Sequence, residues 1–187
     1  MLVKRLFFLA SLALALAACS GHTVHRVEVD LLSFVPQGSR SGTLSLAQAE
    51  VRLPDDPAGQ AIQVPGAEAL EDGRIALQVG LQNTGTLPAD LTLEVRAGPQ
   101  SDPNLYDGTG GDFAVKTASL TLEPGNAGTL DGSLAIGPGD PLYNLIKTGA
   151  FRLGARIRVN SGDQVGYTLN QAEVVLRLRL FNLIPNP

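Results

Sequence analysis

Residues Phe151 to Val159 read FRLGARIRV, and every second residue of this stretch is apolar or small. That set occupies the odd positions, whereas three arginines and one glycine occupy the even positions. Successive side chains of a β-strand point to opposite faces, so this period of two predicts a strand with one buried and one exposed face. The same alternation recurs at Ile75–Leu81, Leu91–Val95 and Val174–Leu180.

Clusters of turn-forming residues separate the alternating stretches at intervals of about ten residues. They lie at 36–38, 54–57, 83–85, 124–126, 138–141 and 160–163. Short alternating strands between such turns are typical of an all-β antiparallel sandwich or partly closed barrel, here with about 7–9 strands. Asp140 followed by Pro141 suits the start of a helix, which predicts one short helix near 141–148.

The positions of the apolar residues also predict how the last strands pair. A loop of residues 160–164 between Val159 and Val165 would place Ile157 opposite Tyr167 and keep both apolar sets buried. The last strands are therefore expected to be neighbours in one sheet.

The apolar set changes from odd to even numbers between Leu169 and Val174. A β-bulge near Gln171, or a break into two strands, would produce this change.

The N-terminus has the pattern of a secretory leader. Lys4 and Arg5 precede an uncharged apolar run from Leu6 to Ala18. At about 1.5 Å per residue this run is too short to cross a hydrocarbon core of about 30 Å, so it is typical of a signal peptide rather than a retained membrane helix.

The residues Leu16-Ala17-Ala18-Cys19 resemble the lipobox of bacterial lipoproteins. The resemblance implies a signal peptide over 1–18, a lipid on Cys19 that anchors the chain to a membrane, and a short tether over 19–26 before a single domain over 27–187. The alternative is an ordinary signal peptide with an incidental cysteine. Cys19 is the only cysteine of the chain, and an unpaired thiol would be a liability in an oxidising compartment.

Ser20 follows Cys19 where the resemblance associates Asp with retention at the inner membrane. The resemblance thus implies an outer-membrane lipoprotein facing the periplasm or the cell surface, provided that the organism has an outer membrane.

The region 75–136 resembles bacterial immunoglobulin-like modules of the CARDB type. The matching features are Asn83-Thr84-Gly85 after an alternating strand, a further strand after Pro88, and Leu122-Glu123-Pro124-Gly125. The resemblance implies an immunoglobulin-like β-sandwich that acts as a spacer, an adhesion module or an accessory binding domain. The chain has no tryptophan and no cysteine pair to strengthen it.

Charge is unevenly distributed along the chain. Residues 19–149 hold seven basic and sixteen acidic groups, a net charge of −9, whereas residues 150–187 hold five arginines and two acids, a net charge of +3. These arginines are Arg152, Arg156, Arg158, Arg177 and Arg179. If the last strands share a sheet, the five arginines form one face that suits an anionic lipid, a polysaccharide phosphate or an acidic envelope protein. The alternative is that they only solubilise the strands.

The loop segment QSDPNLYDGTGGDF (100–113) is rich in oxygen ligands. Asp102, Asn104, Asp107 and Asp112 would suit calcium, but Tyr106 occupies the third ligand position of an EF-type loop. An ordinary Asx-rich turn is the favoured interpretation, so neither a metal nor another cofactor is predicted.

No catalytic motif supports an enzyme class, and a mildly acidic chain is not expected to bind nucleic acid. The sequence favours a non-catalytic, membrane-anchored envelope lipoprotein that serves as a binding or structural accessory module. One alternative is a carrier for a small ligand or lipid, which would need a cavity between the sheets. The remote alternative is a hydrolase, which would need two carboxylates at catalytic separation.

Overall fold

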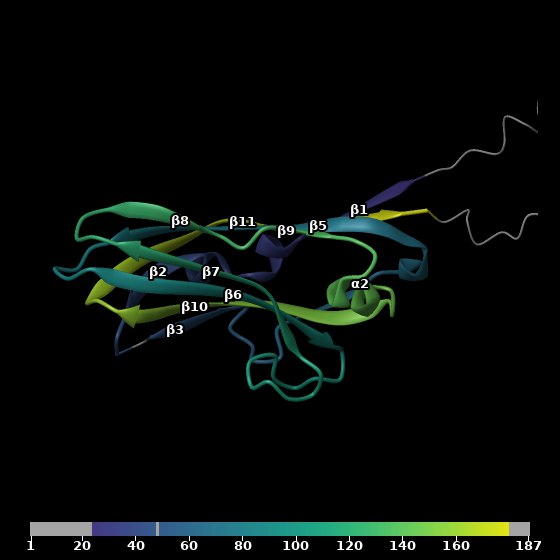
Figure 1. The fold of residues 1–187 in the computed structure, drawn as a ribbon, viewed down its shortest axis with the longest axis horizontal. Coiled ribbons are helices and arrows are strands. Elements are labelled where there is room, and N and C mark those ends of the chain that lie inside the picture. The colour runs from purple at the N-terminus through teal and green to yellow at the C-terminus, as the bar shows by residue number, and fades with distance from the viewer. Residues whose placement is uncertain (1–23, 48, 180–187) are drawn as a thin grey trace, which may run out of the picture.

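The computed structural model describes residues 24–47 and 49–179. The predicted signal peptide, Cys19 and most of the predicted tether lie outside these residues. The described part consists of two antiparallel β-sheets stacked face to face, with a short helix at one end (Figure 1). The predicted all-β antiparallel sandwich is confirmed. No helix in the described ranges is long and apolar enough to cross a bilayer.

The elements, with η for a 3-10 turn, are β1 (His25–Asp30), η1 (Leu31–Phe34), η2 (Gln37–Ser39), β2 (Ser41–Ser45), β3 (Glu50–Leu53), β4 (Gln60–Gln63), η3 (Ala67–Ala69), β5 (Leu70–Asn83), β6 (Ala89–Pro99), β7 (Phe113–Leu122), β8 (Ala127–Asp131), β9 (Leu134–Ile136), α2 (Pro141–Ile146), β10 (Ala150–Ser161) and β11 (Gln164–Leu178). β1 thus includes the last two residues of the predicted tether.

Three of the four sheet edges consist of two short strands in series. In the six-stranded sheet, β1 and β2 both pair with β11, and β8 and β9 both pair with β5, which also pairs with β11. In the five-stranded sheet, β3 and β4 both pair with β10, followed by β6 and β7. These divided edges explain why the described residues form eleven strands where about 7–9 were predicted.

The strand order is that of a jelly roll. We count each divided edge as one strand and number the resulting eight strands in chain order. The two sheets then have the strand orders 1-8-3-6 and 2-7-4-5. An immunoglobulin sandwich instead places strands A, B, E and D in one sheet and C, F and G in the other. The immunoglobulin-like type is therefore not confirmed, because turn residues such as Asn83-Thr84-Gly85 serve either topology.

The predicted pairing of the last two strands is wrong. β10 lies in the five-stranded sheet and β11 in the six-stranded sheet, so the turn at 162–163 crosses between the layers. Ile157 lies opposite Leu93, and Tyr167 lies opposite Leu81. Both strands nevertheless turn their apolar sets inward, because alternation reports which face is buried and not which sheet a strand joins.

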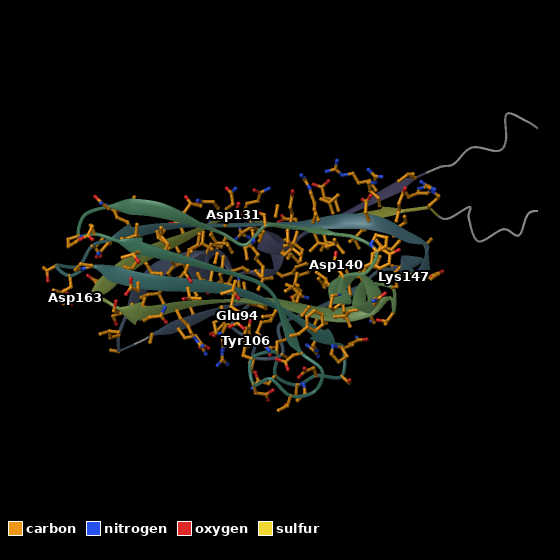
Figure 2. All side chains as sticks on the ribbon, viewed as in Figure 1. Glu94, Tyr106, Asp131, Asp140, Lys147 and Asp163 are labelled. Carbon is orange, nitrogen blue, oxygen red and sulfur yellow. The ribbon has the colours of Figure 1, made fainter. Side chains whose placement is uncertain are left out.

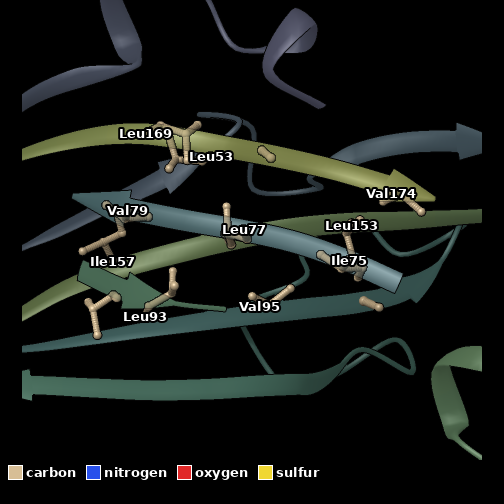
Figure 3. Packing of buried hydrophobic residues seen from close by; sticks show 14 of the residues in the cluster. Leu53, Ile75, Leu77, Val79, Leu93, Val95, Leu153, Ile157, Leu169 and Val174 are labelled. Carbon is tan, nitrogen blue, oxygen red and sulfur yellow. The ribbon is translucent and has the colours of Figure 1, made fainter. Parts of the chain in front are cut away.

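The predicted bulge is confirmed. The pairing of β11 with β5 shifts between Leu169 and Gln171, and the buried set changes there from odd to even positions. Leu169 and Val174 therefore both reach the core although their numbers differ in parity (Figure 3).

Apolar side chains from the two inner faces fill the space between the layers (Figures 2 and 3). Ile75, Leu77 and Val79 of β5 lie on one inner face, and Leu93 and Val95 of β6 lie on the other. Since every described strand and the described core lie within residues 24–179, a chain that begins at Ser20 retains the whole described sandwich.

The helix α2 lies within the predicted range and closes one end of the sandwich. Leu142 and Ile146 are buried, and the Tyr143 hydroxyl donates a hydrogen bond to the Leu70 carbonyl. The first strand starts at this same end, since His25 is paired with Leu178 (Figure 1).

Candidate functional site

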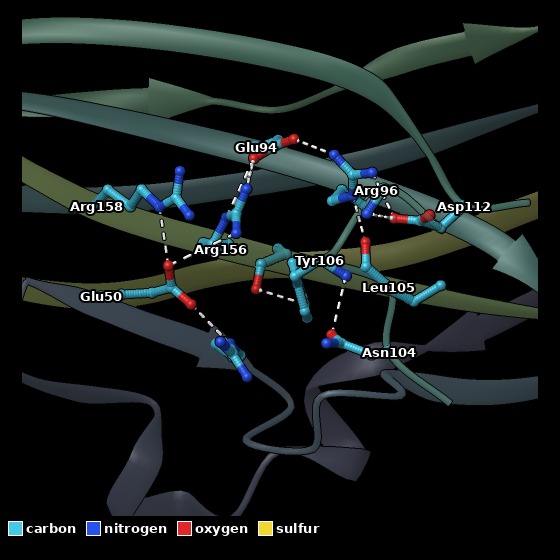
Figure 4. Close-up of polar contacts among 12 residues, drawn as sticks. Glu50, Glu94, Arg96, Asn104, Leu105, Tyr106, Asp112, Arg156 and Arg158 are labelled. Carbon is cyan, nitrogen blue, oxygen red and sulfur yellow. Dashed lines mark hydrogen bonds and ion pairs between the residues drawn. The ribbon is translucent and has the colours of Figure 1, made fainter. Parts of the chain in front are cut away.

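A cluster of charged side chains covers the outer face of the five-stranded sheet (Figure 4). The alternation that buries odd positions of β6 and β10 turns Glu94 and Arg156 outward, and these two residues are register partners. On the other side of β10, Arg156 is paired with Arg52 and Arg158 with Glu50. We call Glu50, Arg52, Glu94, Arg96, Tyr106, Asp112, Arg156 and Arg158 the polar cluster.

Arg156 is the centre of the polar cluster. Its Nε donates to Glu94 Oε2 at 3.1 Å, and its Nη2 forms a shorter bond to the same oxygen. Its Nη1 forms an ion pair with Glu50 Oε2 at 3.7 Å, and the same oxygen accepts a hydrogen bond from Arg158 Nε at 2.8 Å. Arg156 is only 6% exposed, so two carboxylates compensate a charge that is almost completely removed from water.

Tyr106 covers the polar cluster from the loop between β6 and β7. Its ring centroid lies 5.1 Å from the guanidinium carbon of Arg52 and 5.2 Å from that of Arg156. Cations at such distances are attracted by the negative face of the ring. The buried hydroxyl donates to the Ala155 carbonyl at 3.1 Å, which holds the loop against β10.

Arg96 fastens the same loop at a second point. Its guanidinium donates to the Leu105 carbonyl, to Glu94 and to Asp112. The middle of the loop, at Leu105, and its end, at Asp112, are therefore both bound to Arg96 of β6, and the loop shields Arg156 from solvent.

The protonation states follow from these contacts. Burial raises the pKa of Glu50 and of Glu94, but the hydrogen bonds from the neighbouring arginines have the larger combined effect. The pKa of each glutamate therefore lies below its ordinary value of 4.5. Burial raises the pKa of the Tyr106 hydroxyl above its ordinary 10.0. At neutral pH both carboxylates are thus charged and the hydroxyl is neutral, a pattern that suits a structural cluster better than proton transfer.

The structure does not bring the five C-terminal arginines onto one face. Arg152, Arg156 and Arg158 belong to β10 of the five-stranded sheet. Arg177 lies on β11 of the six-stranded sheet, and Arg179 is the first residue after the end of β11. The expectation of a shared face is wrong because it depended on the two last strands being neighbours.

Each of these arginines also has acceptors within the chain. Arg152 donates to the carbonyls of Gln100, Ala58 and Gly59. Arg177 and Arg179 form ion pairs with acidic groups at the start of β5, Glu71 and Asp72.

The oxygen-rich loop residues each have hydrogen-bond partners within the chain. Asp107 accepts from Thr109, Asn104 accepts from the Tyr106 amide, and Asp112 accepts from Arg96. Asp102 is buried and accepts from the Asn104 amide. Within residues 24–47 and 49–179, no group of three or more His, Cys, Asp or Glu side chains is placed to hold a metal ion.

Sequence reasoning named Arg156 and Arg158 but not their partners Glu50, Glu94 and Tyr106. A signal for the glutamates was present in the sequence, because Glu94 lies between the buried Leu93 and Val95, and Glu50 precedes the half-buried Val51 in a short alternating strand. Nothing local in the sequence indicates that Tyr106 folds back over β10.

A small cavity opens between the sheets, with a volume of about 40 Å³. Leu77, Val95 and Leu169 lie at its inner side, and Phe34 and Pro54 lie toward the surface. Pockets for whole small-molecule ligands occupy about 300–1,000 Å³, so this cavity has room for only part of such a molecule.

No protein-family model and no curated protein matches the chain. Among solved structures, it is similar to T=1 particles derived from infectious bursal disease virus, with a TM-score of 0.46, 10% identity, and coverage of 85% of this chain and 32% of the viral chain. It is also similar to the CBM22-1–GH10 modules of Clostridium thermocellum xylanase 10B, with a TM-score of 0.37, 12% identity, and coverage of 84% and 25%.

The Drosophila NLP core gives a TM-score of 0.32 at 7% identity, over 83% of this chain and 97% of the other. The present chain spans about a third of the length of the viral chains that it matches. Since all these TM-scores are below 0.5, the similarities carry no conclusion about function.

Proposed function

We propose that this protein is a non-catalytic envelope lipoprotein, anchored through Cys19, that acts as a binding or structural accessory module close to the membrane. The observation that carries the proposal is the start of β1 at His25, six residues after Cys19. Six extended residues reach about 20 Å, so a lipid on Cys19 would hold the α2 end of the sandwich beside the bilayer.

The polar cluster supports a non-catalytic role. A glycosidase needs one carboxyl group with a raised pKa to act as an acid. Glu50 and Glu94 both bind Arg156, and the pKa of each is lowered. Both carboxylates are therefore occupied in holding an arginine.

The cavity favours an accessory module over a carrier of whole lipids. Its volume of about 40 Å³ is far below that of a pocket for a complete small ligand. The proposed partner is an envelope protein; an anionic lipid or polysaccharide is the second possibility.

Anchoring is tested by expressing the full chain in a bacterium with an outer membrane, in the presence of a clickable palmitate analogue. Wild type and Ser20→Ala are expected to take up the label and to sediment with membranes, whereas Cys19→Ser is expected to do neither. Ser20→Asp should move the labelled protein to the inner membrane. Equal labelling of Cys19→Ser would contradict the proposal.

Partner binding is tested separately by mild detergent extraction after brief crosslinking in cells. A partner that copurifies in stoichiometric amount with wild type is expected. A monodisperse protein without a partner under these conditions would count against the accessory role.

A further inference from the structure

The two sheets are interrupted at the same level along one side of the sandwich. In the six-stranded sheet, β2 pairs with residues 164–168 of β11 and β1 with residues 173–178, and η1 and η2 connect them. In the five-stranded sheet, β3 pairs with residues 155–158 of β10 and β4 with residues 150–153. The segment 54–59 connects β3 and β4, so both edges lack a regular strand here.

The cavity lies at these two interruptions. Leu31, Phe34 and Val35 come from the first connection, and Pro54 comes from the second. The remaining wall consists of strand residues beside the gaps, among them Leu77, Leu153, Leu169 and Ala172. Phe34 is 47% exposed, so the cavity reaches the surface at the side of the sandwich.

The size and lining of the cavity limit what it can hold. A group of the size of a water molecule needs about 10–15 Å³ of cavity volume. A cavity of about 40 Å³ therefore has room for about three or four groups of that size. Almost all of the wall is apolar, and an apolar cavity does not hold water well. A branched four-carbon side chain such as that of leucine fits these limits.

The two connections at the opening carry more acidic than basic side chains, and Arg152 of β10 also contacts the second connection through the carbonyls of Ala58 and Gly59. The connections 30–40 and 54–59 contain Asp30, Asp55 and Asp56 but only one basic residue, Arg40. Arg40 donates to the carbonyls of Leu32 and Val35, whereas Asp55 and Asp56 are exposed. Burial, and to a smaller extent the charge of Asp55, raise the pKa of the Tyr167 hydroxyl, which donates to the Ser39 carbonyl of the first connection.

We propose that this lateral cavity binds one leucine or isoleucine side chain of a protein partner, next to a lysine or arginine of that partner. The inference rests on the proposed accessory function, whose partner-binding site it names. A fatty acyl chain is a poorer occupant for two reasons. Only its last few carbons would be sheltered, and a free carboxylate would be repelled by Asp55 and Asp56.

The test uses the chain from Ser20 to Pro187 with labelled methyl groups, followed by NMR. The probe is N-acetyl-leucyl-lysinamide, and N-acetyl-alanyl-lysinamide is its matched control. We expect saturable shifts of the Leu153 and Leu169 methyl groups with the leucyl probe and roughly tenfold weaker binding of the alanyl probe. Sodium octanoate represents the acyl chain and is expected to bind more weakly than the leucyl probe.

Two variants locate the site. Ala172→Leu fills the cavity and should weaken binding of the leucyl probe about tenfold, whereas Ala61→Leu on the exposed face of β4 should not. Asp55→Asn combined with Asp56→Asn keeps the cavity, and it should weaken binding about threefold at low salt and less at high salt. Exposed Asp107→Asn is the charge control for this pair.

The absence of saturable methyl shifts, equal binding of the alanyl probe, or tighter binding of octanoate would each overturn the inference. So would unchanged binding after a folded Ala172→Leu variant or, if that variant does not fold, after the aspartate pair is replaced. Such a failure would leave membrane anchoring and copurification of a partner intact, so it is distinguishable from failure of the proposed function.

Discussion

Arg156 of β10 and Glu94 of β6 are direct register partners on adjacent strands, and two guanidinium nitrogens of Arg156 donate to one oxygen of Glu94. The exposed fraction of the side chain is 7% for Arg156 and 16% for Glu94, so the pair is largely desolvated. Removing one member would leave the other as a buried charge with reduced compensation.

Glu94→Gln is therefore expected to lower the free energy of unfolding by about 2–4 kcal/mol, measured by urea denaturation at pH 7. The matched control is Glu28→Gln, since Glu28 is paired with Arg26 in an exposed ion pair. That control should change the free energy by less than about 1 kcal/mol. Similar losses in both variants would mean that the burial of the Arg156–Glu94 pair contributes nothing.

Stability should fall in acid because the folded-state pKa values of Glu50 and Glu94 lie below the ordinary 4.5. A lowered pKa adds stability that is present above the unfolded-state value and lost as the pH falls through the folded-state value. Thermal melting between pH 7 and pH 3 should thus show a decline that starts near pH 4.5 and continues below it. Glu94→Gln should make this decline shallower, and an unchanged slope would contradict the assignment.

The contact between the Tyr106 loop and β10 predicts a steric effect at Gly154. A Cβ added to Gly154 would collide with the Tyr106 hydroxyl. Gly154→Ala is expected to cost about 1–3 kcal/mol, whereas Gly38→Ala, where a Cβ meets nothing within 4 Å, should cost much less.

The double variant Gly154→Ala with Tyr106→Phe provides the decisive comparison. Tyr106→Phe alone should cost about 1 kcal/mol through loss of the hydrogen bond to Ala155. With the hydroxyl removed, the alanine should be tolerated better, so the two losses should sum to more than the loss measured in the double variant. Additive losses would show that the collision is not the cause.

Calcium is not expected to stabilise the chain. One oxygen of Asp112 accepts a hydrogen bond from Arg96. Asp102, Asn104 and Asp107 each accept a hydrogen bond from a backbone amide two residues further along the loop. The melting temperature should change by less than about 1 °C when millimolar calcium is added after chelator treatment. A larger rise that Asp102→Asn abolishes would instead establish a calcium site in this loop.

Much of the local structure was predictable from the sequence. The alternation in FRLGARIRV shows that 151, 153, 155, 157 and 159 face inward, and all five are buried. The change of parity between Leu169 and Val174 located a bulge that the strand register contains. Both features depend on neighbouring residues along the chain, since side-chain direction in a strand is a local property.

The sequence by itself thus determined the clearly alternating strands and their buried faces, the short helix, and the resemblance of the N-terminal segment to a lipoprotein leader. Only the tertiary structure decided that β10 and β11 lie in different sheets and that the five arginines are divided between them. It also decided that Tyr106 closes over Arg156, and that two interrupted edges leave a cavity between them. The reason is that the period of two specifies a face, whereas the choice of sheet depends on which distant strands pair and pack.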